Sequence, residues 1–203
     1  MDIDASRILE TEQKTVEIVP KMLSSSQRVL DVGGGGEGII SLLYQQKVVA
    51  IDKRAEELYE ISESSSLKMV MDATHLSFID HQFDCATAFF SFMYMSEMEI
   101  SNVLKEVYRV LKPKGTFEIW DIELPSTHDV DQNIFIVQLE IVMNNNFITT
   151  GYGVELTEKN RNMDGMRRLI FKSDFIVKES VLNKNGTFYF ELIKQNSPSD
   201  SQA

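Results

Sequence analysis

Short apolar runs alternate with segments of helical spacing along the middle of the chain. The runs have the length of strands and are rich in Val, Ile, Leu and Phe, which is typical of buried strands. They predict strands at residues 29–31, 47–52, 67–72, 83–90 and 116–122. Between them, residues 37–46, 54–62 and 97–111 carry apolar side chains at helical spacing. This alternation predicts an α/β fold built from βαβ units, with a parallel sheet covered on both faces.

The two ends of the chain have different patterns. In residues 4–23, apolar side chains are spread among Glu, Lys and Arg, which we interpret as one or two amphipathic helices that Pro20 kinks or ends. Residues 175–182 and 187–193 are predicted strands joined through Asn185-Gly186. This dipeptide favours a tight hairpin turn, so the sheet is expected to end in an antiparallel pair.

Residues 124–159 interrupt the alternation. Within them, residues 134–143 and 147–156 are rich in β-branched and apolar side chains and are joined by three asparagines, which tolerate the positive φ of a tight turn. They predict a β-hairpin, inserted where a simple α/β repeat would have a helix. Helical spacing resumes at residues 160–172.

The length of the chain is consistent with one domain. A chain of 203 residues can bury a sizeable core. We expect a single domain over residues 1–196, in which 1–25 form an N-terminal helical segment and 124–159 the inserted hairpin. The polar residues 197–203 are predicted to be a disordered tail.

A run of glycines, Gly33 to Gly36, follows the first strand, and Gly38 precedes the next helix. Glycine permits a sharp turn with positive φ and lets a ligand approach the backbone closely. The free N–H groups at a helix N-terminus favour a ligand with negative or polar groups. A strand, a glycine turn and a helix in this order predict a nucleotide-binding loop.

The first three predicted strands each end in an acidic residue: Asp31, Asp52 and Asp72. Aspartate is also common as a helix cap or turn residue, but the carboxyl ends of parallel strands form the ligand crevice of such sheets. There Asp52 is placed to accept hydrogen bonds from both hydroxyls of a ribose, and Asp72 from an exocyclic amine such as that of adenine. Asp31 is expected to hold a water or an ammonium group near the glycine turn.

The composition restricts the ligand and the compartment. With 20 Lys and Arg against 31 Asp and Glu, the net charge is −11, which argues against a nucleic acid as substrate because phosphate binding needs a basic face. The single Cys85 cannot form an internal disulfide, and the sequence contains no signal peptide or long apolar span. We therefore expect a cytoplasmic protein that binds neither nucleic acid nor membrane.

Several motifs together resemble the class I S-adenosylmethionine-dependent methyltransferases, from about residue 28 to residue 194. The first motif of that family resembles residues 29–38, its acidic second-strand end residues 48–52, and its adenine-contacting segment residues 71–78. Residues 106–117, which include Val-Leu-Lys-Pro-Lys-Gly, are the most specific match outside the glycine turn. The resemblance implies a Rossmann-like, doubly wound sheet of seven strands in the order 3-2-1-4-5-7-6, with the last strand antiparallel.

The resemblance also implies S-adenosylmethionine as cofactor and a direct in-line methyl transfer, most simply to a small molecule. The implied cofactor-binding residues are the three strand-end acids, the glycine turn and their neighbours: Asp31, Gly33, Gly34, Gly35, Gly38, Asp52, Lys53, Asp72, Ala73 and Phe90. A sulfonium is already a good leaving group, and a general base is needed only if the acceptor is protonated. The sequence therefore assigns no catalytic residue.

The glycine turn departs from the family pattern at position 37. A third alternating glycine would fall there, but the residue is Glu37 and the next glycine is Gly38. Glu37 either points away from the ligand or helps to hold the amino-acid end of the cofactor. The resulting spacing, Gly33-x-Gly35-x-x-Gly38, is also the dinucleotide fingerprint of nicotinamide enzymes.

An NAD(P)-dependent oxidoreductase is therefore the alternative interpretation. Tyr108 and Lys112 have the Tyr-x-x-x-Lys spacing of short-chain dehydrogenases. However, they lie in the last turn of a predicted helix, away from the carboxyl ends of the strands, and the acids at 31 and 72 have no role in such an enzyme. These observations favour the methyltransferase interpretation.

Candidate contacts to the methyl acceptor are Tyr94, Tyr152 and His128, which are hydrogen-bonding or basic groups. Residues 90–95 are rich in Phe and Met; if they line the pocket, the acceptor is small and partly apolar. A polar loop also contains two histidines and two aspartates at positions 75, 80, 81 and 84, but without a recognised ligand spacing, so no metal site is predicted.

The hairpin at residues 134–156 has two readings. Its apolar residues are expected either to close an active site or to form an interface, for example in a homodimer. A non-catalytic, nucleotide-binding interaction domain is thus a further alternative to an enzyme.

Overall fold

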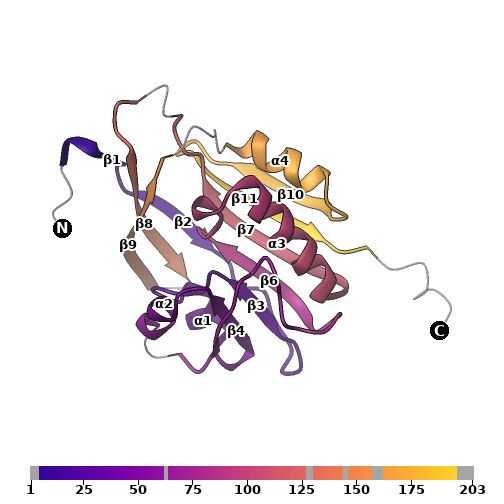
Figure 1. Cartoon of the computed structure of the whole chain (residues 1–203). Coiled ribbons are helices and arrows are strands. Elements are labelled where there is room, and N and C mark those ends of the chain that lie inside the picture. The colour runs from indigo at the N-terminus through magenta and orange to yellow at the C-terminus, as the bar shows by residue number, and fades with distance from the viewer. Residues whose placement is uncertain (1–4, 62–63, 127–129, 144–145, 157–161, 196–203) are drawn as a thin grey trace.

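The computed structural model describes residues 5–61, 64–126, 130–143, 146–156 and 162–195, and the predicted disordered tail at 197–203 lies outside them (Figure 1). Within these described segments, the structure contains two β-sheets and four α-helices. No helix in the described part of the chain is long and apolar enough to cross a membrane.

The larger sheet has seven strands, in the order β10-β11-β7-β6-β3-β4-β5. Their bounds are β3 Val29–Val32, β4 Val48–Asp52, β5 Leu67–Val70, β6 Phe83–Phe89, β7 Leu111–Ile122, β10 Ile176–Leu182 and β11 Thr187–Ile193. Strands β3 to β7 pair in parallel, while β11 is antiparallel to both β7 and β10. Numbered along the chain, this is the order 3-2-1-4-5-7-6 that the sequence predicted.

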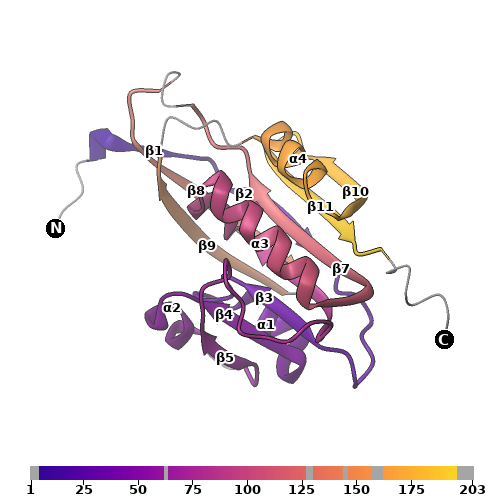
Figure 2. The ribbon, with the colours of Figure 1, turned by 45° about the vertical axis from the view of Figure 1, so that its right-hand side comes forward.

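One face of this sheet is covered by α3 (Glu97–Val110) and α4 (Met163–Phe171), which lie in front of it in Figures 1 and 2. Helix α3 begins with a capping box, in which the Ser96 side chain accepts from the Glu99 N–H and the Glu99 carboxylate accepts from the Ser96 N–H. Its apolar side chains recur at helical spacing, and Ile100, Val103, Leu104, Val107 and Val110 are buried in the core, while Met98 is exposed. The predicted helix at 97–111 is confirmed.

The N-terminal segment is extended, so the predicted helix at 4–23 is wrong. It forms a short 3-10 turn, Ala5–Arg7, followed by strands β1 (Ile8–Glu10) and β2 (Lys14–Ile18). In β2, buried Val16 and Ile18 alternate with exposed neighbours, which is the period of a strand. The segment pairs in parallel with β8 (Ile134–Met143), a strand more than a hundred residues away in sequence.

The predicted hairpin is present, and it belongs to this second sheet. Strand β9 (Asn146–Glu155) pairs antiparallel with β8 along its whole length. Alternate side chains of β8 are buried, and they share a core with α1 (Ile39–Tyr44) and α2 (Ala55–Glu60) on the second face of the large sheet. The hairpin is therefore part of the core rather than an appended insertion, and a second sheet replaces some of the helices that the sequence predicted on this face. A homodimer through the hairpin stays a prediction.

Candidate functional site

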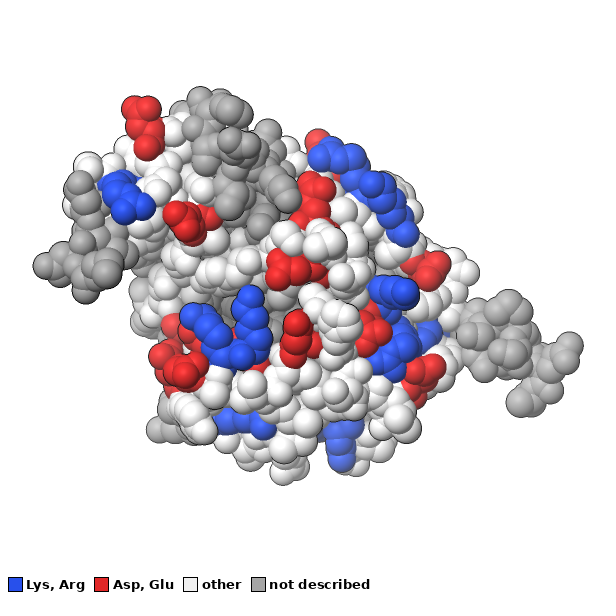
Figure 3. All heavy atoms as spheres, in the orientation of Figure 1, with Lys and Arg blue, Asp and Glu red and all other residues white. Residues whose placement is uncertain are grey.

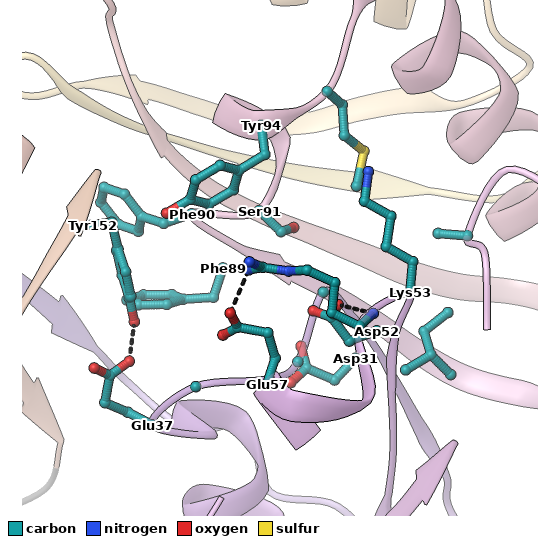
Figure 4. Close-up of a pocket in the computed structure, with 18 of the residues that line it drawn as sticks. Asp31, Glu37, Asp52, Lys53, Glu57, Phe89, Phe90, Ser91, Tyr94 and Tyr152 are labelled. Carbon is teal, nitrogen blue, oxygen red and sulfur yellow. Dashed lines mark hydrogen bonds and ion pairs between the residues drawn. The ribbon is translucent and has the colours of Figure 1, made fainter. Parts of the chain in front are cut away.

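A cleft of about 740 Å³ opens at the carboxyl ends of β3, β4 and β6, where the glycine turn and the β8–β9 hairpin meet (Figure 4). Its walls include the glycine turn, the acids Asp31, Asp52 and Asp72 with the residues beside them, residues 89–91 and 94–95, and part of β9. This is the size of a typical ligand site, and its place at the carboxyl end of a parallel sheet is where such folds bind ligands.

The glycine turn is shaped by backbone conformation and by close neighbours. Gly33, Gly36 and Gly38 have φ of +67°, +61° and +62°, in the left-handed region that side chains disfavour. A Cβ on Gly33 would lie 2.5 Å from the Cβ of Ser91, and one on Gly34 would collide with the Asp31 carboxylate. These glycines are required because the protein itself packs tightly around the turn.

Of the predicted cofactor residues, only Gly38 does not line the cleft. It immediately precedes α1, and a Cβ there would lie 2.5 Å from the side chain of Ile61. Its role is to let the chain turn into the helix against that side chain.

Asp31 is almost completely buried, at 2% exposure, beneath the glycine turn. Its carboxylate accepts a 2.7 Å hydrogen bond from the Thr87 hydroxyl, and no described Lys or Arg forms an ion pair with it. Burial raises its pKa from 3.8 to about 7, repulsion from Asp52 adds to the rise, and the bond from Thr87 opposes it. A cationic group of a ligand placed in the cleft would therefore be stabilised beside Asp31.

Asp52 and Asp72 lie on the same side of the cleft and are held by local turns. The Asp52 Oδ1 accepts from the Arg54 N–H at 2.9 Å, while its Oδ2 lies close to Gly35. Asp72 accepts from the N–H and the hydroxyl of Thr74 at 2.8 and 2.7 Å, and these bonds lower its pKa. Lys53 and Ala73 line the cleft beside them. The three acids are thus brought together, as the sequence predicted, although Asp31 lies one residue before the end of its strand.

Aromatic rings form the other end of the cleft. Phe90 is buried and has φ of +49°, a strained conformation that its N–H stabilises by donating to the Trp120 carbonyl at 2.8 Å. Its ring centroid lies 5.9 Å from that of Tyr152, and Tyr94 lines the same region (Figure 4). Burial, followed by the charge of Glu37, raises the pKa of Tyr152, so its phenol is neutral at pH 7. His128, the third predicted acceptor contact, lies outside the described residues.

Glu37 points across the cleft toward the hairpin. The Tyr152 hydroxyl donates to its Oε2 at 2.9 Å, and the Thr150 hydroxyl donates to its Oε1 (Figure 4). The carboxylate therefore joins the glycine turn to β9 and still lines the cleft.

Two features of the cleft were not predicted from the sequence. Ser91 is buried beside Gly33, and its hydroxyl is without a hydrogen-bond partner in the described structure. Gly151 and Gly153 flank Tyr152 in β9 and contribute the cleft wall there. The hairpin was expected either to close an active site or to form an interface, and the structure places this strand in the cleft wall, where Tyr152 bonds to Glu37 of the glycine turn.

The residues of the oxidoreductase interpretation lie elsewhere. Tyr108 packs edge-on against Phe175, at 5.0 Å between ring centroids, and Lys112 forms a 2.8 Å ion pair with Asp84. Neither residue lines the cleft. Their spacing is explained by packing and by a structural ion pair.

The acids and histidines of the polar loop are likewise used separately. Asp80 pairs with Arg109 at 2.8 Å, and His81 hydrogen-bonds the Leu111 carbonyl at 3.1 Å. In the parts of the chain that the structure describes, no three His, Cys, Asp or Glu side chains form a group that could hold a metal ion.

Comparisons with known proteins agree on one family. Residues 30–119 match the family described as a methyltransferase domain. Demethylmenaquinone methyltransferases from Lactobacillus johnsonii and Thermotoga maritima are 33% and 30% identical over 95 and 136 residues, which are 47% and 63% of this chain. The chain spans 37% and 57% of the lengths of these curated relatives.

A solved structure shares the fold. That of a S-adenosylmethionine-dependent methyltransferase from Methanosarcina mazei has a TM-score of 0.58 with 19% sequence identity, and the match covers 86% of this chain and 95% of that one. At this identity the likeness establishes the fold alone.

Proposed function

We propose that this chain is a class I S-adenosylmethionine-dependent methyltransferase, which the match of residues 30–119 to a methyltransferase domain supports, and that it transfers a methyl group from S-adenosylmethionine to a small, partly apolar acceptor. The observation that carries the proposal is the convergence of Asp31, Asp52 and Asp72 around a glycine-lined cleft. Each acid offers a different part of the cofactor a matching partner.

The residues present fit this cofactor by their chemistry. Asp52 would accept from the two ribose hydroxyls, Asp72 from the adenine amine, and buried Asp31 would meet the ammonium of the amino-acid end. Asp31 and Glu57 fill the space where a Cβ on Gly34 or Gly35 would lie, and both glycines line the cleft with their backbone. The cofactor supplies a methyl group on a positively charged sulfur, which an acidic cleft stabilises.

The chain's own contribution to the reaction is positioning and exclusion of water. The strained backbone at Phe90 directs its ring to the boundary between the cofactor end and the acceptor end. The β8–β9 hairpin covers this end and keeps Tyr152 beside it. Holding two reactants in line in a desolvated site accelerates a methyl transfer, and a base is needed only where the acceptor carries a proton.

The acceptor class follows from the lining of the cleft. Phe90, Tyr94 and Tyr152 give this end an aromatic surface, which suits a molecule with an apolar or planar part. The names of the two relatives, demethylmenaquinone methyltransferases, support a small-molecule acceptor. We expect the protein to act in the cytoplasm, without nucleic-acid partners.

Calorimetry separates this proposal from its alternatives. We expect S-adenosylmethionine and its demethylated product, S-adenosylhomocysteine, to bind to the purified chain, and NAD to bind much more weakly. Incubation with S-adenosylmethionine and pools of small metabolites, followed by mass spectrometry, would identify the acceptor. Binding of NAD with no response to the sulfonium ligand would contradict the proposal, and cofactor binding without any methylated product would favour a non-catalytic domain.

A further inference from the structure

Glu37 occupies the position where the family pattern has glycine, and its side chain has a defined place in the structure. Its two carboxylate oxygens accept hydrogen bonds from Tyr152, at 2.9 Å, and from Thr150. Both partners are on β9, more than a hundred residues along the chain. A carboxylate is thus fixed at the aromatic end of the cleft, away from Asp52 (Figure 4).

Glu37 and Tyr152 can accept hydrogen bonds from a ligand, but they have no proton left to donate to it. An ionised carboxylate only accepts hydrogen bonds, and a phenol has one proton to donate. Tyr152 uses that proton on Glu37, so only the lone pairs of its oxygen remain for a ligand. Both groups lie in the wall of the cleft. They present acceptors and no donor to whatever occupies this end.

The charged residues around the cleft also favour a ligand that donates hydrogen bonds over an anionic one. Of the described residues that line the cleft, only Lys53 and Arg54 are basic, and Arg54 is paired with Glu57. Glu57 and Glu155 add further negative charge near the aromatic rings. On the face of the molecule in Figure 3, basic and acidic side chains are interspersed rather than gathered in one basic surface. An anionic acceptor would be repelled here, while an amine or a hydroxyl would find its hydrogen-bond partners.

Resting on the function proposed above, we propose that the methyl acceptor reacts through a nitrogen or oxygen that carries a proton, and that Glu37 binds and then accepts this proton. The acceptor's lone pair forms the new bond to the methyl carbon while the carbon–sulfur bond breaks toward sulfur. The N–H or O–H proton passes to the Glu37 carboxylate, and an acceptor nitrogen that carries a second N–H can donate it to the Tyr152 oxygen.

The test uses three matched probes: 2-phenylethylamine, 2-phenylethanol and the methyl ether of 2-phenylethanol, which keeps the oxygen but has no donor. Affinities are measured on the full chain saturated with S-adenosylhomocysteine, by NMR of the methionine methyl groups, since Met71 and Met95 line the cleft. We expect the amine or the alcohol to bind at least about tenfold more tightly than the ether, the effect of one hydrogen bond to a charged group. At pH 7 the amine is an ammonium ion and its binding also reports charge, so the uncharged alcohol and ether measure the hydrogen bond itself.

Variants connect this preference to Glu37. Glu37→Gln should reduce the preference to less than about threefold, and Tyr152→Phe should weaken the donor probes as well. Glu155→Gln is the matched control, because it removes the same charge from the same cleft without a contact to Tyr152, and it should keep the preference. S-adenosylhomocysteine affinity, measured by calorimetry, should stay unchanged in Glu37→Gln, whereas a merely disturbed glycine turn would lower it.

The outcomes separate the two proposals. If the wild-type chain does not bind S-adenosylhomocysteine, the proposed function is wrong. If it does bind, then equal affinities for the three probes, no binding of either donor probe, or a donor preference that survives in Glu37→Gln would overturn the inference alone.

Discussion

Lys21 joins the N-terminal segment to the large sheet, and replacing it by methionine tests how that joint is stabilised. Its Nζ lies 2.6 Å from the Glu191 Oε1 and 3.1 Å from the Glu118 Oε1. The two glutamates face each other directly in the β7–β11 register, and their side chains are only 6–7% exposed. Without Lys21, two buried carboxylates would remain side by side.

The expected loss of stability depends on which contacts Glu118 and Glu191 keep once Lys21 is replaced. Removing one partner of a fully buried ion pair costs about 3–5 kcal/mol. Lys21 is 33% exposed, and Glu191 keeps a 3.1 Å contact to Lys178 while Glu118 keeps a bond from Tyr189. We therefore expect Lys21→Met to lower the free energy of unfolding by about 1.5–2.5 kcal/mol at pH 7.

The loss should depend on pH. Burial works to lower the pKa of Lys21, but Glu118 and Glu191 outweigh it, so the pKa is raised above 10.5 and the stabilisation is lost as pH rises through the raised value. Burial works to raise the pKa of Glu191, but Lys21 and Lys178 outweigh it, and the net pKa lies below 4.5. The contribution of Glu191 is then present above pH 4.5 and lost as pH falls through its lowered pKa. The difference between variant and wild type should be largest between these limits.

Urea unfolding at a series of pH values measures this difference. Lys105→Met on the exposed side of α3 is the control and should change stability by less than about 0.5 kcal/mol. Adding Glu118→Gln to Lys21→Met should restore part of the loss, because one of the two adjacent charges is gone. A loss at pH 7 equal to that of the control, or one that persists unchanged at pH 3, would refute the reasoning.

Three further predictions concern the cleft. Burial raises the pKa of Asp31 from 3.8 to about 7, so the ligand-free protein should lose stability as pH rises through this range. In urea titrations, Asp31→Asn should remove up to about 4 kcal/mol of that loss at pH 8. An effect of the substitution that does not depend on pH would contradict this. Asp52→Ala should weaken S-adenosylhomocysteine binding by about 1–3 kcal/mol in calorimetry, and unchanged affinity would show the ribose assignment to be wrong. Gly38→Ala should cost about 2–4 kcal/mol of stability, because its Cβ would lie 2.5 Å from the Ile61 side chain. Gly186→Ala is the control and should cost about 1 kcal/mol, because nothing lies within 4 Å of the added Cβ. Equal losses in the two variants would exclude the steric explanation.

The large sheet could be predicted because its signals are local. Strands β3 to β6 and residues 116–122 of β7 are short, mostly apolar runs, and α3 has a long regular apolar stripe with a capping box at its start. These features depend on residues close together in sequence, so periodicity and turn chemistry were sufficient. The strand order came from the resemblance of several motifs to one family rather than from the pattern itself.

The N-terminal segment could not be predicted in the same way. Its apolar residues are few and are mixed with charges, which also suits an amphipathic helix. The segment is a strand because β8 offers it an unpaired edge and a buried face, as the register of Val16 with Ile141 shows. Pairing with a strand so distant in sequence cannot be recognised from the residues of the N-terminal segment alone.

For the site, the sequence by itself determined the glycine turn and the three acids, and hence the end of the cleft where we propose that the cofactor binds. Only the tertiary structure decided the acceptor end, because it depends on β9 lying over the turn. Glu37 in isolation had two possible directions, and the hydroxyls of Thr150 and Tyr152 selected one of them. The physical reason is that the backbone itself positions residues that follow directly after a strand. Contacts between separate sheets form only once both sheets are packed.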